Sequence, residues 1–384
     1  MKVFQSIPRK VNFAVPTATD HREYTVTARC YYIDAGKPCP GCTMVQVQNP
    51  EKEIFGTNGK KMNVDFVKKV IQKQAREGIN LITYMGGDPL TFNEFSQIIK
   101  WTTEHPVLTG LTYSPSLYFL KGEEFSDKFY LFEEAGLFSP NYFLASVDKL
   151  ILNQKDIEGG SSDFKSYFGL KFVTKLIKKH YEDVAIHQTI RADTIDDTLP
   201  LYHWAVENGV LFSLCPMVWK PYLRGKDVNP DKDEFFKLRL KEKHEGQLQE
   251  IISYLIEAET KRLRQGKKRS LIPSSAFLRL MPKYGPNNLL SCRIQRKGKR
   301  PNGHDIHPTG EHRWCIAQNK KQDGLKCGGC YYIGIDRGKS DYWHFEKLAG
   351  KFKKGDLRWL NYHVWKKDPN FDPTRKNIVF EAKD

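Results

Sequence analysis

The sequence predicts an α/β protein, a partial (β/α)6 TIM-like barrel followed by a cysteine-rich α+β extension. Strand-like and helix-like runs alternate over about 200 residues, which is typical of a parallel sheet with right-handed crossovers. The chain has 384 residues, more than one average domain. After residue 265 it becomes rich in loops and contains four further cysteines. We expect an N-terminal segment over 1–20, the barrel over 21–225 and the extension with a basic region over 226–384.

The expected strands are short runs rich in β-branched and apolar residues. They span 23–30, 79–90, 107–114, 141–148, 184–193 and 210–219. The expected helices carry apolar residues at three- and four-residue spacing. They span 63–78, 92–104, 164–180 and 198–209. One or two polar helices follow in 231–265, with Gly246 as the candidate break.

Thiol, glycine and polar residues fall at or near the ends of these strands. They are Cys30, the Gly86-Gly87 turn, Ser146, Arg191 and Cys215. Because the working groups of such barrels lie at the carboxyl ends of the strands, we expect these residues at one edge of the sheet.

Composition favours a cytoplasmic globular protein. The hydrophobic fraction is 40%, and no apolar run reaches the length of a membrane helix. The start, "MKVFQSIPRK", contains no secretory h-region. In the cytoplasm, the eight cysteines are expected to be metal ligands or catalytic thiols rather than disulfides.

The formal charge of +16 is concentrated in the later part of the chain. Residues 1–150 hold 17 Lys and Arg against 16 Asp and Glu, whereas 261–300 hold 13 basic residues and no acidic one. Such a block attracts anions such as nucleic acids, nucleotides or phosphorylated metabolites. A solvated basic surface is the equally weighted alternative.

The segment "RCYYIDAGKPCPGCTM" places Cys30, Cys39 and Cys42 on one loop. Three thiolates can hold three irons of a [4Fe–4S] cluster and leave the fourth iron open to a small ligand. A redox pair of Cys39 and Cys42 is the alternative, but that motif usually opens a helix, and "TMVQVQNP" does not have a helical pattern.

These features resemble those of the radical S-adenosylmethionine (SAM) enzymes over roughly residues 20–225. The resemblance implies that SAM chelates the open iron through its amino and carboxylate groups. It also implies that the reduced cluster cleaves SAM to a 5'-deoxyadenosyl radical, which abstracts hydrogen from an unactivated C–H bond. An electron donor such as flavodoxin or ferredoxin is then required.

The resemblance also points to residues that contact SAM. The segment "MGGDPL" is similar to the family's Gly-Gly-Glu-like turn, although taken alone it could be a plain turn. The implied contacts are Gly86, Gly87, Asp88 and Pro89 in that turn, Ser146 in "LASVD", and Gln188 or Arg191 on the fifth strand.

Two features depart from the family pattern. The first cysteine gap is eight residues, where three is usual, and Gly41 precedes the last cysteine where an aromatic residue usually contacts adenine. The adenine contact is therefore left unassigned, with Tyr31 or Tyr32 as substitutes.

A second cysteine set follows the barrel. It comprises Cys292, Cys315, Cys327 and Cys330, which can close a structural zinc site or a complete iron–sulfur cluster. The resemblance favours an auxiliary [4Fe–4S] cluster in a twitch-like or SPASM-like region. Between the first two cysteines lie His304, His307 and His312, which are either ligands or, more simply, exposed loop residues.

The remaining thiol, Cys215, has two interpretations. Free cysteine is among the most buried residue types, so a buried apolar role is the simpler one. The alternative is a thiol facing the radical site, able to return a hydrogen atom or ligate a cluster. Asp148, Lys149 and Trp219 are candidates to line the same mouth.

Three functions follow from these observations. The first is a radical SAM enzyme whose substrate, from the basic block, is an anion such as a nucleic acid, nucleotide or phosphorylated metabolite. The second is a radical SAM maturase of ribosomal peptides. The third is a zinc-stabilised nucleic-acid-binding protein. Iron analysis separates the third from the other two.

Overall fold

The computed structural model describes the central part of the chain and short pieces on either side of it. The described residues are 21–27, 29–36, 39, 42, 62–76, 81–105, 108–117, 120–139, 141–217, 237–238, 240–268, 270–272, 278, 305–306 and 312–313.

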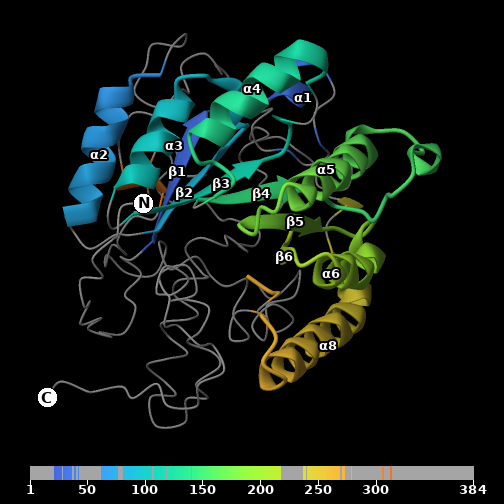
Figure 1. Ribbon diagram of the computed structural model, residues 1–384. Helices are drawn as coiled ribbons and strands as arrows, with labels where there is room; N and C mark the ends of the chain where they lie inside the picture. The colour runs from blue at the N-terminus through green and yellow to red at the C-terminus, as the bar shows by residue number, and fades with distance from the viewer. Residues whose placement is uncertain are drawn as a thin grey trace, which may run out of the picture.

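Six parallel strands form the centre of the molecule (Figure 1). They are β1 (His21–Thr27), β2 (Leu81–Gly86), β3 (Thr109–Ser114), β4 (Tyr142–Ser146), β5 (Val184–Ile190) and β6 (Leu211–Pro216). Each pairs in parallel with its neighbour in the chain, and β6 does not pair with β1 among the described residues. The open parallel sheet confirms the predicted α/β class and the partial barrel.

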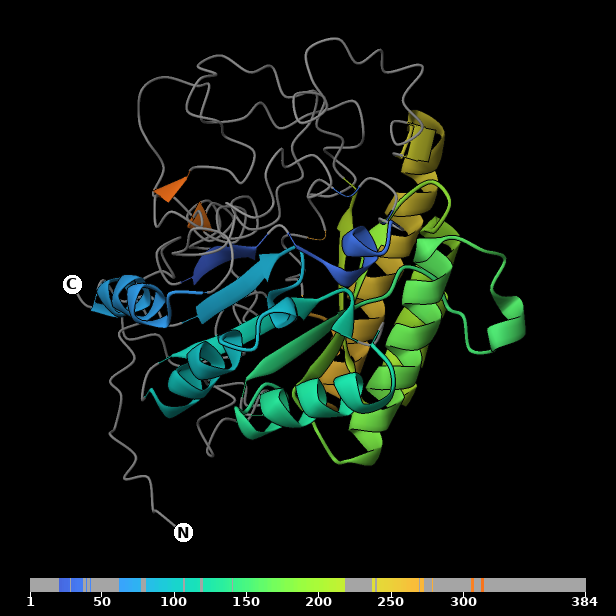
Figure 2. The ribbon, with the colours of Figure 1, turned by 90° about the horizontal axis from the view of Figure 1, so that it is seen from above.

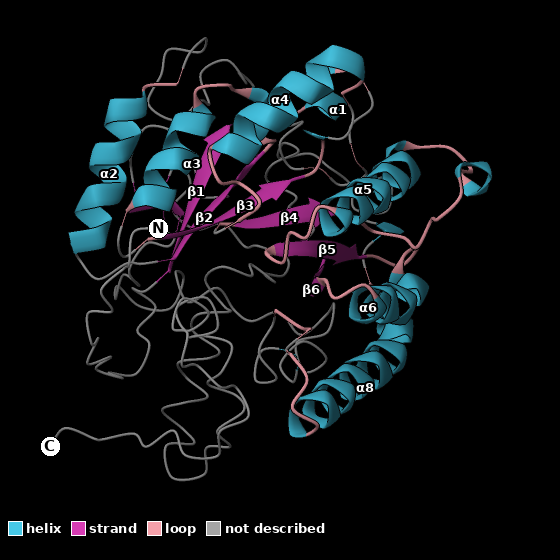
Figure 3. Ribbon diagram, in the orientation of Figure 1, coloured by secondary structure: helices cyan, strands magenta, loops and turns pink. Residues whose placement is uncertain are grey.

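Helices cover one face of this sheet (Figures 1 and 3). The longer ones are α2 (Val64–Arg76), α3 (Phe95–Glu104), α4 (Gly122–Glu134), α5 (Ser161–Lys178), α6 (Thr198–Glu207) and α8 (Glu245–Arg264). The short ones are α1 (Tyr31–Asp34) and the 3-10 turns η3 (Pro89–Thr91), η5 (Gln154–Asp156), η6 (Ile195–Asp197) and η9 (Glu242–His244). None of the described helices combines the length and apolar character needed to cross a bilayer.

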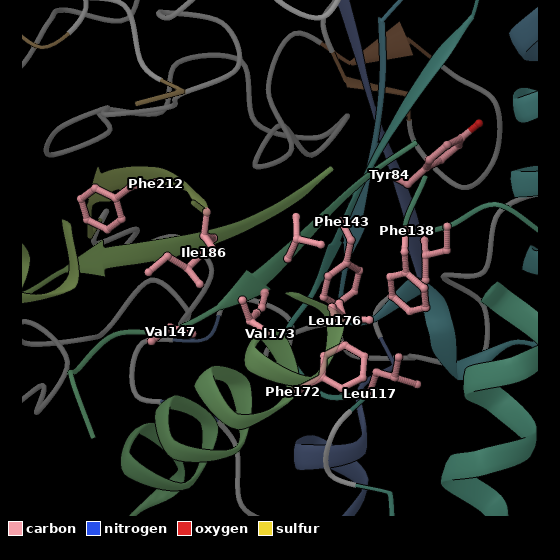
Figure 4. Close-up of a cluster of buried hydrophobic side chains, with 14 of the residues drawn as sticks. Tyr84, Leu117, Phe138, Phe143, Val147, Phe172, Val173, Leu176, Ile186 and Phe212 are labelled. Carbon is pink, nitrogen blue, oxygen red and sulfur yellow. The ribbon is translucent and has the colours of Figure 1, made fainter. Parts of the chain in front are cut away.

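The main core lies between the sheet and the helices (Figure 4). Phe143 of β4 contacts Phe172 of α5 edge to face, with 5.6 Å between ring centroids, and Phe138 packs on Phe143 at 5.3 Å. The opposite face of the sheet carries a smaller apolar cluster that includes Leu144 and Leu211. Because side chains alternate between the two faces of a strand, the strand residues between those of the main core point to this second face.

Several element boundaries differ from the prediction. The first strand ends at Thr27, and Cys30 becomes the N-cap of α1. The second strand ends at Gly86, where φ of +136° leaves the extended region. Helix α4 was not predicted, although its Phe125, Phe129 and Phe132 recur at helical spacing.

The expected break at Gly246 was wrong. Helix α8 runs through this residue without interruption. The change of geometry falls just before it, where η9 gives way to α8. Gly246 lies in the first turn of the helix, where backbone N–H groups have no intrahelical partner, so a glycine there weakens the helix little.

Short described pieces of the C-terminal half pair with part of each edge strand of the six-stranded sheet. Strand β7 (Asp305–Ile306) pairs in parallel with β1, and β8 (His312–Arg313) pairs with β7. At the other edge, the backbone of Ser270 and Ile272 bonds to Phe212 of β6 at 2.7 and 2.9 Å. Covered edges cannot pair with other chains. His312, for which a loop position was expected, thus lies in a strand whose backbone alone is described.

Candidate functional site

The carboxyl ends of the six strands meet at one edge of the sheet, as parallel strands require. The segments that follow them bring together the predicted site residues and several residues that were not predicted. In strand order these are Cys30 after β1, Gly87 and Asp88 after β2, Ser116 after β3, Asp148 after β4, Arg191 after β5 and Cys215 near the end of β6.

The glycine turn, Gly86 to Asp88, is hydrogen-bonded to the segment that leads to Cys30. The backbone N–H of Gly87 donates to the carbonyl oxygen of Thr27 at 2.5 Å, and that of Asp88 donates to the carbonyl of Arg29 at 2.6 Å. Gly86 has a φ of +136°, and a Cβ atom there would lie 2.2 Å from the Thr27 carbonyl oxygen. Glycine is therefore required at 86 for the two segments to approach this closely.

The close contact of Gly86 with Thr27 leads us to expect different losses of stability when Gly86 and a matched glycine, Gly159, are replaced by Ala. Gly159→Ala should cost about 1–2 kcal/mol of unfolding free energy, because φ is +117° but no atom lies within 4 Å of the new Cβ. Gly86→Ala should cost a further ~1–3 kcal/mol, because the β1 backbone must move. Urea unfolding of both variants measures the difference. Equal losses would show that the contact with Thr27 does not constrain the turn.

The Asp88 side chain organises this turn from inside. It is fully buried, and its Oδ1 accepts the N–H of Leu90 at 2.9 Å as the N-cap of η3, the turn that Pro89 begins. Its Oδ2 accepts the hydroxyl of Ser114 at 2.8 Å, and the N–H and hydroxyl of Ser116 at 3.0 and 2.6 Å. The carboxylate thus ties the ends of β2 and β3 together.

Cys30 is connected to the same group of hydrogen bonds. Its thiol is 5% exposed and donates to Ser116 Oγ at 3.4 Å. Burial, followed by the Asp88 carboxylate, raises the pKa of Cys30 to about 12, and the Ser116 hydrogen bond opposes this. In the absence of a bound cation, the thiol is therefore neutral at physiological pH.

Cys39 and Cys42 are partly exposed and close to each other in the chain. The N–H of Cys42 donates to the carbonyl of Cys39 at 3.0 Å. Burial raises the pKa of the Cys39 thiol, and the nearby Lys165 ammonium opposes the rise most strongly. Cys39 contributes to the raised pKa of Cys30, and both thiols contribute to the raised pKa of Tyr32, which places the two thiols near one another.

The arrangement of the three thiols distinguishes between a single metal ion and a cluster as the group that they could hold. Among the described residues, no three Cys, His, Asp or Glu side chains converge on a point that could hold a single ion. A cubane cluster does not require this, because each thiolate binds a different iron. Iron would also stabilise the thiolate form that burial disfavours. The buried Cys30 thiol, the Cys39 thiol near Lys165 and the Cys42 thiol therefore fit a cluster better than a single-ion site.

Asp148 is the centre of a buried group of charges beside Cys39. Its Oδ2 accepts Lys165 Nζ at 2.7 Å and Arg191 Nη1 at 2.9 Å. Burial alone would raise the pKa of Asp148, but Lys165 and Arg191 hold it well below its usual value. Arg191 also binds Asp193 through Nε at 2.9 Å and Nη2 at 3.0 Å. The Arg191 guanidinium thus joins Asp148, which follows β4, to Asp193, which follows β5.

Two other predicted SAM contacts lie on opposite faces of the sheet. Gln188 shares the helix-covered face with Ile186, and its amide Nε2 donates to the carbonyls of Asp148 and Thr194 at 3.1 and 2.9 Å. Ser146 is on the other face, where its hydroxyl accepts the phenol of Tyr113 at 2.7 Å. Only Ser146 therefore faces the inner side of the barrel.

Cys215 is also on the inner face and contacts a histidine. Its Sγ lies 3.3 Å from Nε2 of His187, whose Nδ1 lies 3.0 Å from the hydroxyl of Ser213. The His187 ring meets Tyr113 edge to face at 5.4 Å. The thiol is 7% exposed. His187, Ser213 and Tyr113 were not predicted, although polar residues at alternate positions of adjacent strands are a signal that could have found them.

Some predicted site residues are outside the described part of the chain. They are Trp219, Cys292, Cys315, Cys327 and Cys330, the side chains of His304, His307 and His312, and most of the basic segment 261–300. Within that segment, Lys267 and Lys268 are exposed, and Lys268 forms a surface ion pair with Glu182 at 3.2 Å.

Comparison with known proteins gives remote matches. No protein-family model and no curated protein sequence matches the chain. Among solved structures, SuiB of Streptococcus suis is 12% identical with a TM-score of 0.42, and the match covers 66% of this chain and 49% of SuiB. The chain thus spans about half the length of SuiB. The structure of anSMEcpe with bound AdoMet and Cp18Cys peptide is 12% identical with a TM-score of 0.47, covering 86% of this chain and 83% of that one.

Proposed function

We propose that this protein is a radical SAM enzyme in which Cys30, Cys39 and Cys42 hold a [4Fe–4S] cluster. One observation carries the proposal. The glycine turn after β2 is hydrogen-bonded to the backbone of Thr27 and Arg29, directly before the first thiol. Similarity at 12% identity is too remote to add to it, so the proposal rests on the site itself.

The chain's own residues have definite tasks in this proposal. When bound, the cluster supplies the electron that cleaves SAM. Ser116 positions the Cys30 sulfur through the 3.4 Å hydrogen bond. Lys165 places a positive charge near Cys39, which favours the thiolate over the thiol. The bonded turn at Gly87 holds backbone beside the open side of the thiol loop, where the amino group of SAM is expected to bind.

The remaining SAM contacts and the substrate are parts of the same proposal. Ser146 is the contact that the inner face supports best, because its hydroxyl lies on that face beside Tyr113. The reaction is hydrogen abstraction at an unactivated C–H bond, with an electron donor of the flavodoxin or ferredoxin type. The basic segment 261–300 favours an anionic substrate, and a peptide is the alternative.

We also propose that Cys292, Cys315, Cys327 and Cys330 hold an auxiliary [4Fe–4S] cluster. Strand β7, which lies between the first two of these cysteines, pairs with β1, the strand that leads to Cys30. This pairing supports a second cluster near β1, at that edge of the sheet.

Metal analysis tests the two clusters and the zinc alternative together. After anaerobic reconstitution, the wild-type protein should contain about eight irons, and the Cys30, Cys39 and Cys42 triple Ala variant about four, the content of one cubane. Retention of one zinc and no iron in the variant would instead support a structural metal behind the barrel. Iron-free wild-type protein with tightly bound zinc would favour the nucleic-acid-binding alternative.

A further inference from the structure

Residues of α4 and α5, two helices of the layer that covers the sheet (Figures 1 and 2), line a large pocket. Its volume is about 900 Å³. Tyr32 of α1 and Ser161 at the start of α5 are the lining residues nearest the thiol loop, since both interact with Cys39. A cavity of this size holds a ligand of drug-like or nucleotide-like dimensions.

The walls of the pocket are mainly aromatic. Phe125 of α4 lines it together with Phe164, Phe168 and Phe172 of α5, and Phe125 contacts Phe172 edge to face with 5.8 Å between ring centroids. Phe164 and Phe168 are stacked almost in parallel, with an interplanar angle of 9° and 6.4 Å between centroids, and Phe164 is 37% exposed. A parallel pair of rings, one exposed and one half-buried, offers a surface on which a planar group can stack.

The rim of the pocket is positively charged. Lys121, Lys171 and Lys175 line it, against the single carboxylate of Glu124. Among the described residues, none of these three lysines forms an ion pair with a carboxylate. Lys175 Nζ instead lies 5.0 Å from the Phe125 ring centroid. The cations are therefore available to a ligand without breaking a salt bridge.

Two helix N-termini lie at the pocket, with Glu123 and Glu124 in the first turn of α4 and Asp163 in that of α5. Helix α4 has 13 residues and begins at Gly122, and α5 has 18 and begins at Ser161, so both start at the pocket wall. Neither N-cap residue, Lys121 or Gly160, provides a side-chain hydrogen bond to its helix. The first N–H groups of a helix favour anionic oxygens.

We propose that this pocket binds a small aromatic anion, meaning a planar ring system that carries a phosphate or carboxylate. The ring stacks against Phe164 and Phe168, and the anionic group lies among the three lysines and the first turns of α4 and α5. Most of its walls belong to the helix layer rather than to the inner face of the barrel, and it meets the thiol loop only at its Ser161 end, where Ser161 is hydrogen-bonded to Cys39. It does not depend on the proposed SAM chemistry.

A matched pair of probes tests the two halves of the proposal. Riboflavin 5'-phosphate and riboflavin share one ring system and differ by the phosphate. Calorimetric titration of the reconstituted full chain should show riboflavin 5'-phosphate binding at least about tenfold more tightly, because hydrogen bonds to a charged group contribute about 1.5–3 kcal/mol each. Equal affinity for the two probes, or no binding of either, would overturn the proposal.

Single substitutions locate the probe. Lys171→Gln should weaken riboflavin 5'-phosphate but not riboflavin, whereas Phe164→Ala should weaken both by about tenfold, as loss of a stacking ring does. Two controls lie outside the pocket, Lys178→Gln on α5 and Tyr130→Ala on α4, where Tyr130 is 55% exposed. They should leave both affinities unchanged. An equal effect of control and pocket variants would show that the flavin binds elsewhere.

Titration in the presence of saturating SAM shows whether the probe binds in this pocket or in the proposed SAM site. If the pocket is separate from the thiol site, SAM should not displace riboflavin 5'-phosphate. Competitive displacement would place the probe in the SAM site and refute the second pocket. Both results are obtained without turnover, so failure of SAM cleavage leaves this test unaffected.

Discussion

Formation of 5'-deoxyadenosine is expected to disappear when Cys30, Cys39 and Cys42 are all replaced by Ala. Without the three thiolates, no iron can be held at the ends of β1 and β2, and SAM has no open iron to bind. The measurement is chromatographic quantification of 5'-deoxyadenosine after anaerobic reconstitution and chemical reduction.

Cys215→Ala is the matched control, because it removes a described cysteine that lies on β6 rather than on the thiol loop. It should retain uncoupled 5'-deoxyadenosine formation. If Cys215 returns a hydrogen atom to the substrate radical, this variant should still cleave SAM while yielding less product. Unchanged 5'-deoxyadenosine formation in the triple Ala variant would exclude the thiol loop as the site of SAM cleavage.

Asp148→Asn is expected to destabilise the fold by about 3–5 kcal/mol, because it leaves Lys165 and Arg191 buried with one carboxylate fewer. Lys165 is 4% exposed and Arg191 2% exposed, so water cannot replace the lost partner. Asp193→Asn is the control. Asp193 also binds Arg191, but its side chain is 38% exposed, and its loss should cost much less. Thermal or urea unfolding of the two variants measures the difference. Equal losses of stability in the two variants would mean that the burial of Asp148 does not determine how much it stabilises the fold.

The same group predicts the direction of the acid dependence of stability. The folded-state pKa of Asp148 lies below its unfolded value, which is near 3.9. Its contribution is therefore complete at neutral pH and is lost as the pH falls below about 5. The wild-type protein should lose stability over this range more steeply than Asp148→Asn, in which the carboxylate is absent. Parallel stability curves for the two proteins would contradict this assignment.

Much of the fold could be predicted because its signals are local. Apolar alternation in β4 and β5 and helical spacing in α2 and α6 are properties of short segments, and their observed bounds lie within a few residues of those expected. Helix α4 was missed although its Phe125, Phe129 and Phe132 recur at helical spacing, so the signal was present in the sequence and was overlooked. The end of β2 could not be located either, since it depends on the φ of Gly86 and its contact with Thr27.

For the candidate site, the placement of residues could be predicted from the sequence, but their contacts could not. Parallel strands bring their carboxyl ends to one edge, so the placement of Cys30, Gly86 and Cys215 at that edge followed from strand order alone. The contacts that position them join residues far apart in the chain. Ser116 bonds to Cys30 across 86 positions, and Arg191 pairs with Asp148 across 43. Such pairs depend on tertiary packing and have no local pattern in the sequence.

The most direct test of the central claim is electron paramagnetic resonance of the reduced protein with and without SAM. If SAM binds the open iron held by Cys30, Cys39 and Cys42, adding it should change the signal of one cluster. The signal of the second cluster should stay the same, and the triple Ala variant should show the second signal alone. Identical spectra with and without SAM in the wild-type protein would contradict the assignment of the thiol loop as the SAM-binding cluster site.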